Sequence, residues 1–216
     1  MTSPPDPQQG AGGGPVLRLL SGALQLWLRQ QCSRVDSLEI RLQASAGDLL
    51  RGRLAGVRVK ARGVHYDSLR LELVDLSTGA LQIQMGSVWR GRAVQLLDSF
   101  AIQGLVSFTA AGLNHSLAQP RWRQLADQLA EELVGITPLV GLRMQGNRLL
   151  LAAQGVAQPG PVELEATIQA CPGGLQLQTA DGSQRSLVPM DSTVRVERAT
   201  IEAGMLVLVG EATVTP

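Results

Sequence analysis

Apolar and polar residues alternate over most of this sequence. Between about Val35 and Phe108, and again from Leu139 to Thr213, an apolar residue recurs at every second position, with mostly polar residues between. Because successive side chains of a strand point to opposite faces, this period is typical of antiparallel sheets with one buried face. The chain must therefore either cover an extensive apolar face or use it.

The composition supports a folded chain and argues against several functions. The 216 residues are 44% hydrophobic and 17% charged, which is enough to bury a substantial core. A net charge of +1 and only 3% aromatic residues give no reason to expect nucleic acid as a partner. Cys32 and Cys171 form no CxxC pattern, so they predict neither a zinc site nor a disulfide framework.

Two segments have helical rather than strand periodicity. Apolar residues recur at helical spacing from Pro15 to about Arg34, and again from Pro120 to Gly135. Proline suits the first turn of a helix and glycine suits the position after its end. The first helix has an unusually wide apolar stripe. It either packs on the sheet of its own chain or lies on a membrane or partner, with Trp27 as an anchor.

The N-terminal residues 1–14 are rich in proline and glycine, which predicts a disordered tail. No lysine or arginine precedes the first apolar stretch, so we expect no signal peptide. The stretch Val16–Leu28 is too short for a transmembrane helix and contains Arg18. These features favour a cytoplasmic or peripheral membrane location.

The remaining residues predict strands. We expect Arg53–Val64 to be one strand, with Gly104 as a candidate bulge in a later one. The other expected strands include Ile40, Leu71 with Leu73 on the inner side, Ile83, Leu142, Leu151, Leu164, Leu177, Val196 and Val207. The order of helix then strands occurs twice. The chain is thus either a degenerate duplication, with halves 15–110 and 111–216, or two unrelated units within one domain 15–216.

No constellation of catalytic or metal-binding residues is apparent. His65 ends a strand and His115 lies in an expected turn, and neither has partners at metal-ligand spacing. Glu163 and Glu165 alternate with apolar residues, as solvent-facing charges do. We therefore expect no enzyme activity, no metal and no cofactor.

Two features remain as candidates for function. Arg58, Lys60 and Arg62 share one face of a strand, either as an ordinary solvated face or as a contact for anionic lipid headgroups. The aliphatic inner faces either fill one another as a core or leave room for an apolar ligand.

Short elements of the sequence resemble a known family. The segment from Val35-Asp-Ser-Leu-Glu-Ile to Leu49-Leu-Arg-Gly-Arg-Leu-Ala-Gly-Val-Arg-Val is similar to the LmeA-like phospholipid-binding family (DUF2993). So is Val106-Ser-Phe-Thr-Ala-Ala-Gly-Leu-Asn, which runs into the second helix. The similarity extends over roughly residues 16–214.

The resemblance implies binding of phospholipid or another apolar ligand at or beyond a bacterial membrane. It implies an α+β fold similar to tubular lipid-binding domains, with two amphipathic helices packed on strongly curved antiparallel sheets. Many family members carry an N-terminal signal or anchor. The Pro/Gly-rich residues 1–14 do not resemble such a segment. A protein-interaction scaffold with a fully packed core is the alternative function, and the oligomeric state is open.

On this hypothesis acyl chains contact side chains of the inner faces and headgroups contact the basic strand. The expected acyl-chain contacts are Leu20, Leu24, Trp27, Val57, Val59, Leu71, Leu125, Leu129 and Leu164. The expected headgroup contacts are Arg58, Lys60 and Arg62.

Overall fold

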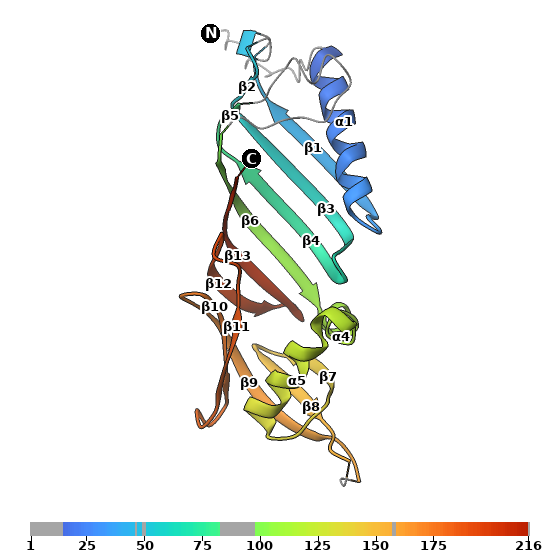
Figure 1. Ribbon diagram of the computed structural model, residues 1–216, viewed down its shortest axis with the longest axis vertical. Helices are drawn as coiled ribbons and strands as arrows, with labels where there is room; N and C mark the ends of the chain where they lie inside the picture. Colours follow the sequence, from blue (N-terminus) through green and yellow to red (C-terminus); the bar gives the residue numbers. More distant parts are fainter. Residues whose placement is uncertain (1–14, 46, 49–50, 83–97, 157–158, 216) are drawn as a thin grey trace, which may run out of the picture.

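The computed structural model describes residues 15–45, 47–48, 51–82, 98–156 and 159–215, with the side chains of residues 15–19 left out. The fold is α+β, as predicted, and its sheets are antiparallel (Figure 1). The described helices are α1 (Pro15–Gln31), α4 (Ala110–Leu117) and α5 (Pro120–Val134).

Two main sheets contain most of the strands. The six-stranded sheet has the order β1 (Ser37–Gln43), β3 (Gly56–Tyr66), β4 (Leu69–Thr78), β6 (Phe100–Thr109), β13 (Met205–Val214), β12 (Val194–Glu202). The five-stranded sheet has the order β11 (Arg185–Pro189), β10 (Gly174–Thr179), β9 (Val162–Cys171), β8 (Arg148–Ala153), β7 (Leu139–Gln145). A small third sheet pairs β2 (Arg53–Leu54) with β5 (Leu81–Gln82).

A tight turn sets the register of the first sheet. Asp67 and Ser68 join β3 to β4 as a two-residue loop, and both have positive φ, +50° and +67°. Positive φ at both central residues matches the right-handed twist of the flanking strands. Tyr66 consequently lies opposite Leu69, and every later pair of the two strands follows from it.

The five-stranded sheet is covered by a helix. Helix α5 packs over β7, β8, β9 and β11. It begins with Pro120 and ends at Gly135, whose φ of +74° closes the last turn, as the sequence predicts. Ala130, Leu151 and Ala166 are at most 1% exposed. The helix and this sheet therefore form a filled core.

Helix α1 lies beside the edge strand β1 (Figure 1). Leu20 is 2% exposed and packs with Leu54 and Leu81 in a second, smaller core. The predicted helix extended to about Arg34, but α1 ends at Gln31. The next residues join the sheet instead, because the Ser33 N–H donates to the carbonyl of His65 at 2.9 Å.

Helix α4 was not predicted, and the expected turn at His115 was wrong because His115 is helical. Thr109 is the N-cap, since its hydroxyl accepts a hydrogen bond from the Gly112 N–H at 3.0 Å. The eight residues of α4 are too few to show a clear helical period.

Two strand predictions also differ from the structure. The predicted strand Arg53–Val64 is divided at Ala55, whose N–H donates to the carbonyl of Gln43. Only Leu81 and Gln82 of the predicted strand around Ile83 are described as β5; Ile83 and Met85 lie outside the described residues.

Gly104 is not a bulge. The register of β6 runs through Gly104 without a shift against both β4 and β13. A Cβ atom at Gly104 would lie only 2.1 Å from the carbonyl oxygen of Asp75, so a close backbone approach requires glycine here. The register shift lies in β12, between Val196 and Arg198.

Strands from both ends of the chain build the first sheet, because β12 and β13 complete the sheet begun by β1, β3, β4 and β6. An internal duplication into halves 15–110 and 111–216 stays a prediction. No described helix has both the length and the apolar content needed to cross a membrane.

Candidate functional site

One face of the six-stranded sheet, here called the apolar face, consists almost entirely of aliphatic side chains. Residues directly opposite each other in antiparallel strands point to the same side. Val59 lies opposite both Ile40 and Leu76, which places these three side chains on one face. Following the register across the sheet adds Leu38, Leu42, Val57, Ala61, Val74, Thr78, Ile102, Val106, Val194, Val196, Ala199, Leu208 and Ala212.

Among the described residues, the apolar face is covered at its two ends and only partly covered between them. At one end, Val57 and Phe100 pack against the small core beneath α1. At the other end, Phe108, Leu206 and Ile201 belong to the main core. Between these ends the side chains of β4, β6 and β13 on this face are only half-buried, including Val74, Leu76, Ile102 and Ala212.

The described helices do not extend over the middle of this face. Helix α1 contacts chiefly β1, and α4 contacts β4 and β6 near the main core (Figure 1). Opposite Leu76, Gly104 and Gly210 lie side by side in the register, so two neighbouring positions have no side chain.

Two hollows formed by described residues are small. One, beside Phe100 and Arg53, has a volume of about 180 Å³. Another, beside Asn114 and Val140, also has about 180 Å³. Pockets that enclose small-molecule ligands usually measure about 300–1,000 Å³. Neither of these two hollows can enclose a two-chain lipid.

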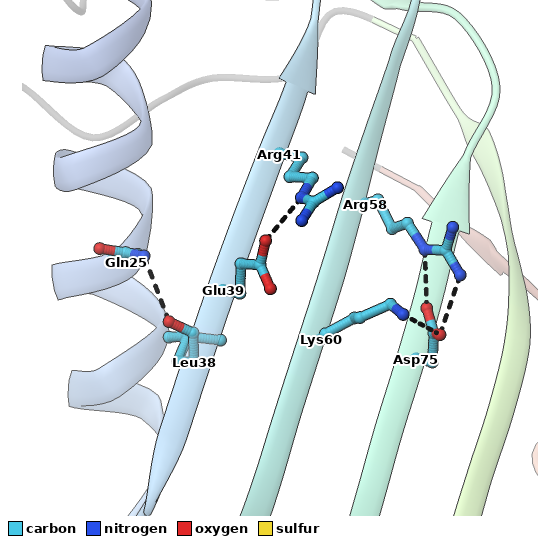
Figure 2. Close-up of polar contacts among 7 residues, drawn as sticks. All are labelled: Gln25, Leu38, Glu39, Arg41, Arg58, Lys60 and Asp75. Atoms are coloured by element: carbon cyan, nitrogen blue, oxygen red, sulfur yellow. Dashed lines mark hydrogen bonds and ion pairs between the residues drawn. The ribbon is translucent and has the colours of Figure 1, made fainter. Parts of the chain in front are cut away.

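The opposite face of the same sheet is polar near β1 and β3 (Figure 2). The carboxylate of Asp75 accepts from Arg58 Nε and Nη2, each at 2.9 Å, and lies 3.2 Å from Lys60 Nζ. The Arg58 hydrogen bonds are the main reason that the pKa of Asp75 lies below its ordinary value, with Lys60 contributing. Two of the three predicted headgroup residues are thus partly neutralised within the protein.

The predicted lipid contacts fall into three groups. Val57 and Val59 lie on the apolar face. Leu20 and Leu24 lie in the small core at one end of it. The other aliphatic residues belong to or pack against the main core: Leu71, Leu125, Leu129 and Leu164.

Trp27 belongs to none of these groups. Its side chain is 50% exposed on α1, and the neighbouring Leu26 is 61% exposed. Arg58, Lys60 and Arg62 have the opposite parity to Val57 and Val59, so they point away from the apolar face. Their predicted contact with a headgroup stays a prediction.

The sequence-based reasoning missed the β4, β6 and β13 members of the apolar face. It assigned Leu71 and Leu73 to the inner side of β4, but Leu73 lies opposite Arg62, and Val74 and Leu76 point the other way. Both the odd-numbered and the even-numbered positions of β4 carry apolar residues, so the sequence did not show which set lies on the apolar face. The Asp67-Ser68 loop was the signal that could have resolved it, because a two-residue hairpin fixes which residues lie opposite each other.

The described residues contain no group of three or more His, Cys, Asp or Glu that could hold a metal ion. Glu163 and Glu165 instead form ion pairs with Arg143 and Arg148 on the outer face of the second sheet.

Comparison with known proteins gave one match. Searches of curated proteins and of solved structures found no match to the chain. The family model for LmeA-like phospholipid-binding proteins matches residues 11–211, which include every strand and helix described above except the last residues of β13. The chain therefore belongs to the LmeA-like phospholipid-binding family.

Proposed function

We propose that this protein binds phospholipid without catalysis at a membrane surface, and that the acyl chains lie on the apolar face of the six-stranded sheet. The partly exposed aliphatic side chains between the two cores are the observation that carries this proposal. Membership of a phospholipid-binding family supports phospholipid as the class of ligand.

The physical chemistry of the apolar face suits an acyl chain. Removing a methylene group from water contributes about 0.8 kcal/mol, so a chain of ten methylenes contributes roughly 8 kcal/mol before the costs of binding. The side chains of Val59, Leu76 and Ile102 are hydrocarbon and form no hydrogen bonds. An acyl chain also has no hydrogen-bonding group, so neither surface leaves a polar group without a partner. The glycine pair Gly104 and Gly210 lets a chain approach the backbone closely.

The packing of the two cores restricts the proposed contacts. We assign acyl-chain contact to Val59, together with Val74, Leu76 and Ile102. Val57, Leu20 and Leu24 bound the face at the α1 end. Leu129 is 5% exposed and packed in the main core, so we assign it to the fold and not to the ligand.

Adjacent residues of β4 provide a matched test. Leu76 points to the apolar face and Ser77 points to the opposite one. We expect wild-type protein, purified without detergent, to show phospholipid adducts in native mass spectrometry. Leu76→Gln should lower the affinity for phospholipid about tenfold, because a polar group replaces buried hydrocarbon. Ser77→Gln should leave it unchanged.

The outcomes separate the proposal from a protein-interaction scaffold. Adducts lost in Leu76→Gln and retained in Ser77→Gln support acyl chains on this face. A wild-type mass free of lipid, together with no uptake of added phosphatidylglycerol, contradicts the proposed function.

A further inference from the structure

We propose that the outer side of α1 is the surface that docks on an anionic phospholipid bilayer. This inference rests on the proposed function, because a protein that binds phospholipid must meet the membrane that supplies it. We call this surface the docking surface and define it by Leu26, Trp27 and Arg29.

The exposed side of α1 is apolar where an ordinary surface helix is polar. The helix buries Leu20 against the chain's own small core, with Leu24 and Leu28 half-buried beside it. That leaves Leu26 and Trp27 adjacent on the solvent side, 61% and 50% exposed. Ala23 lies three residues before Leu26 and four before Trp27, and it is also exposed. These three side chains therefore share one helix face.

Backbone hydrogen bonds fix the C-terminal end of α1 to the sheet. The Ser33 N–H donates to the His65 carbonyl at 2.9 Å, and the His65 N–H donates to the Arg34 carbonyl at 2.8 Å. Tyr66, at the tip of the β3–β4 hairpin, is 51% exposed but has the parity of Arg62 and points to the other face of the sheet. Trp27 is therefore the aromatic residue of the docking surface, and tryptophan is a side chain that prefers the boundary between hydrocarbon and water.

The charges of this region favour an anionic partner. The sequence of α1 contains no acidic residue, and Arg29 is exposed in its last turn. The first two acids that follow α1 in the sequence are paired: Asp36 with Arg34 at 2.9 Å and Glu39 with Arg41 at 2.5 Å. Within the described part of the chain, no ion pair engages Arg29, so its positive charge is available to an anionic partner. Each lysine or arginine near an anionic bilayer contributes about 1 kcal/mol, or about fivefold in affinity.

The chemistry fits a shallow, reversible contact with lipid. Two large apolar side chains can enter the acyl boundary while an arginine stays at the headgroups. A protein partner is the other source of such a contact, and the experiment below distinguishes it.

The test measures binding to vesicles of phosphatidylglycerol and phosphatidylcholine by cosedimentation. The double variant Leu26→Gln/Trp27→Gln should bind about tenfold more weakly or worse. Arg29→Gln should bind about fivefold more weakly at low salt and equal wild type in high salt. The matched control is Leu187→Gln, since Leu187 is 45% exposed on β11. It should bind like wild type.

Two further readouts keep the inference separate from the proposed function. The double variant should retain its phospholipid adducts in native mass spectrometry, whereas Leu76→Gln should lose adducts and still bind vesicles. Tryptophan fluorescence should shift to the blue on vesicle binding, and Trp27→Phe should remove much of that shift.

Because the substituted side chains are exposed, the thermal midpoint of unfolding should stay at the wild-type value. Equal vesicle affinity of wild type and the double variant would overturn the docking surface while leaving the acyl-chain site standing. Loss of vesicle binding in Leu187→Gln to the same extent would overturn it as well.

Discussion

The side chain of Asn114 makes two hydrogen bonds with the backbone of Leu142. Its Nδ2 donates to the Leu142 carbonyl at 2.8 Å, and its Oδ1 accepts from the Leu142 N–H at 2.7 Å. Leu142 lies in β7, the edge strand of the five-stranded sheet, whose outer backbone groups have no neighbouring strand. The side-chain amide of Asn114 makes the two hydrogen bonds that a neighbouring strand would make, and it thereby links α4 to the second sheet.

Asn114→Ala should lower the free energy of unfolding by about 1–3 kcal/mol, because it leaves the N–H of a buried residue without a partner. Leu142 is 5% exposed, so water cannot readily replace the lost bonds. Urea unfolding followed by circular dichroism measures the change. Asn147→Ala, at an exposed turn, is the control and should change stability by less than about 0.5 kcal/mol. Equal effects of the two substitutions would show that the hydrogen bonds between Asn114 and Leu142 do not stabilise the fold.

Gly104→Ala should destabilise the protein by about 2–3 kcal/mol, since the new Cβ would lie 2.1 Å from the carbonyl oxygen of Asp75. Gly22→Ala is a control of opposite sign. Gly22 is exposed in α1 with nothing within 4 Å of a Cβ, so alanine there should stabilise by about 0.5–1 kcal/mol. Thermal unfolding of both variants measures whether each substitution raises or lowers the stability. Destabilisation by Gly22→Ala, or none by Gly104→Ala, would show that backbone approach is not what selects glycine in β6.

The sequence was sufficient to predict the fold class and the role of α5. The helical period from Trp122 to Leu133, bounded by Pro120 and Gly135, specifies a helix that buries one side. Strand alternation such as Leu149, Leu151 and Ala153 specifies which side chains it meets. In this part of the chain, local pattern and tertiary packing agree.

The candidate site was harder to predict, because it depends on pairing between distant strands. Leu76 reaches the apolar face next to Gly104, and Gly210 follows in β13, more than a hundred residues further along the chain. No local pattern states that β13 pairs with β6. The partial exposure of the middle of the face likewise depends on where α1 packs, and Leu20 and Leu24 alone do not specify that position.

The Asp75 carboxylate should make stability depend on pH in the acid range. Its pKa is lowered in the folded protein, chiefly by hydrogen bonds from Arg58. It therefore contributes stability above the unfolded pKa of about 4, and this contribution is lost as the pH falls through the folded pKa.

Asp75→Asn should be less stable than wild type at pH 7, and the difference should shrink as the pH falls toward 2.5. Free energies of unfolding measured by urea between these pH values provide the test. Glu131→Gln on the exposed side of α5 is the control, and its difference from wild type should stay small throughout. A constant deficit of Asp75→Asn across this pH range would show that its ion pairs are not the cause.

Arg62 gives the sharpest test of the predicted headgroup contact. Ion pairs to Asp75 hold Arg58 and Lys60, whereas no ion pair of Arg62 occurs among the described residues, and it is exposed opposite Leu73. If the basic strand contacts headgroups, Arg62→Glu should weaken binding to phosphatidylglycerol vesicles about fivefold or more, and salt should reduce the difference. Arg185→Glu, on the edge strand of the other sheet, is the matched control. Equal binding of both variants would assign Arg58, Lys60 and Arg62 to an ordinary solvated face, because they point away from Val57 and Val59.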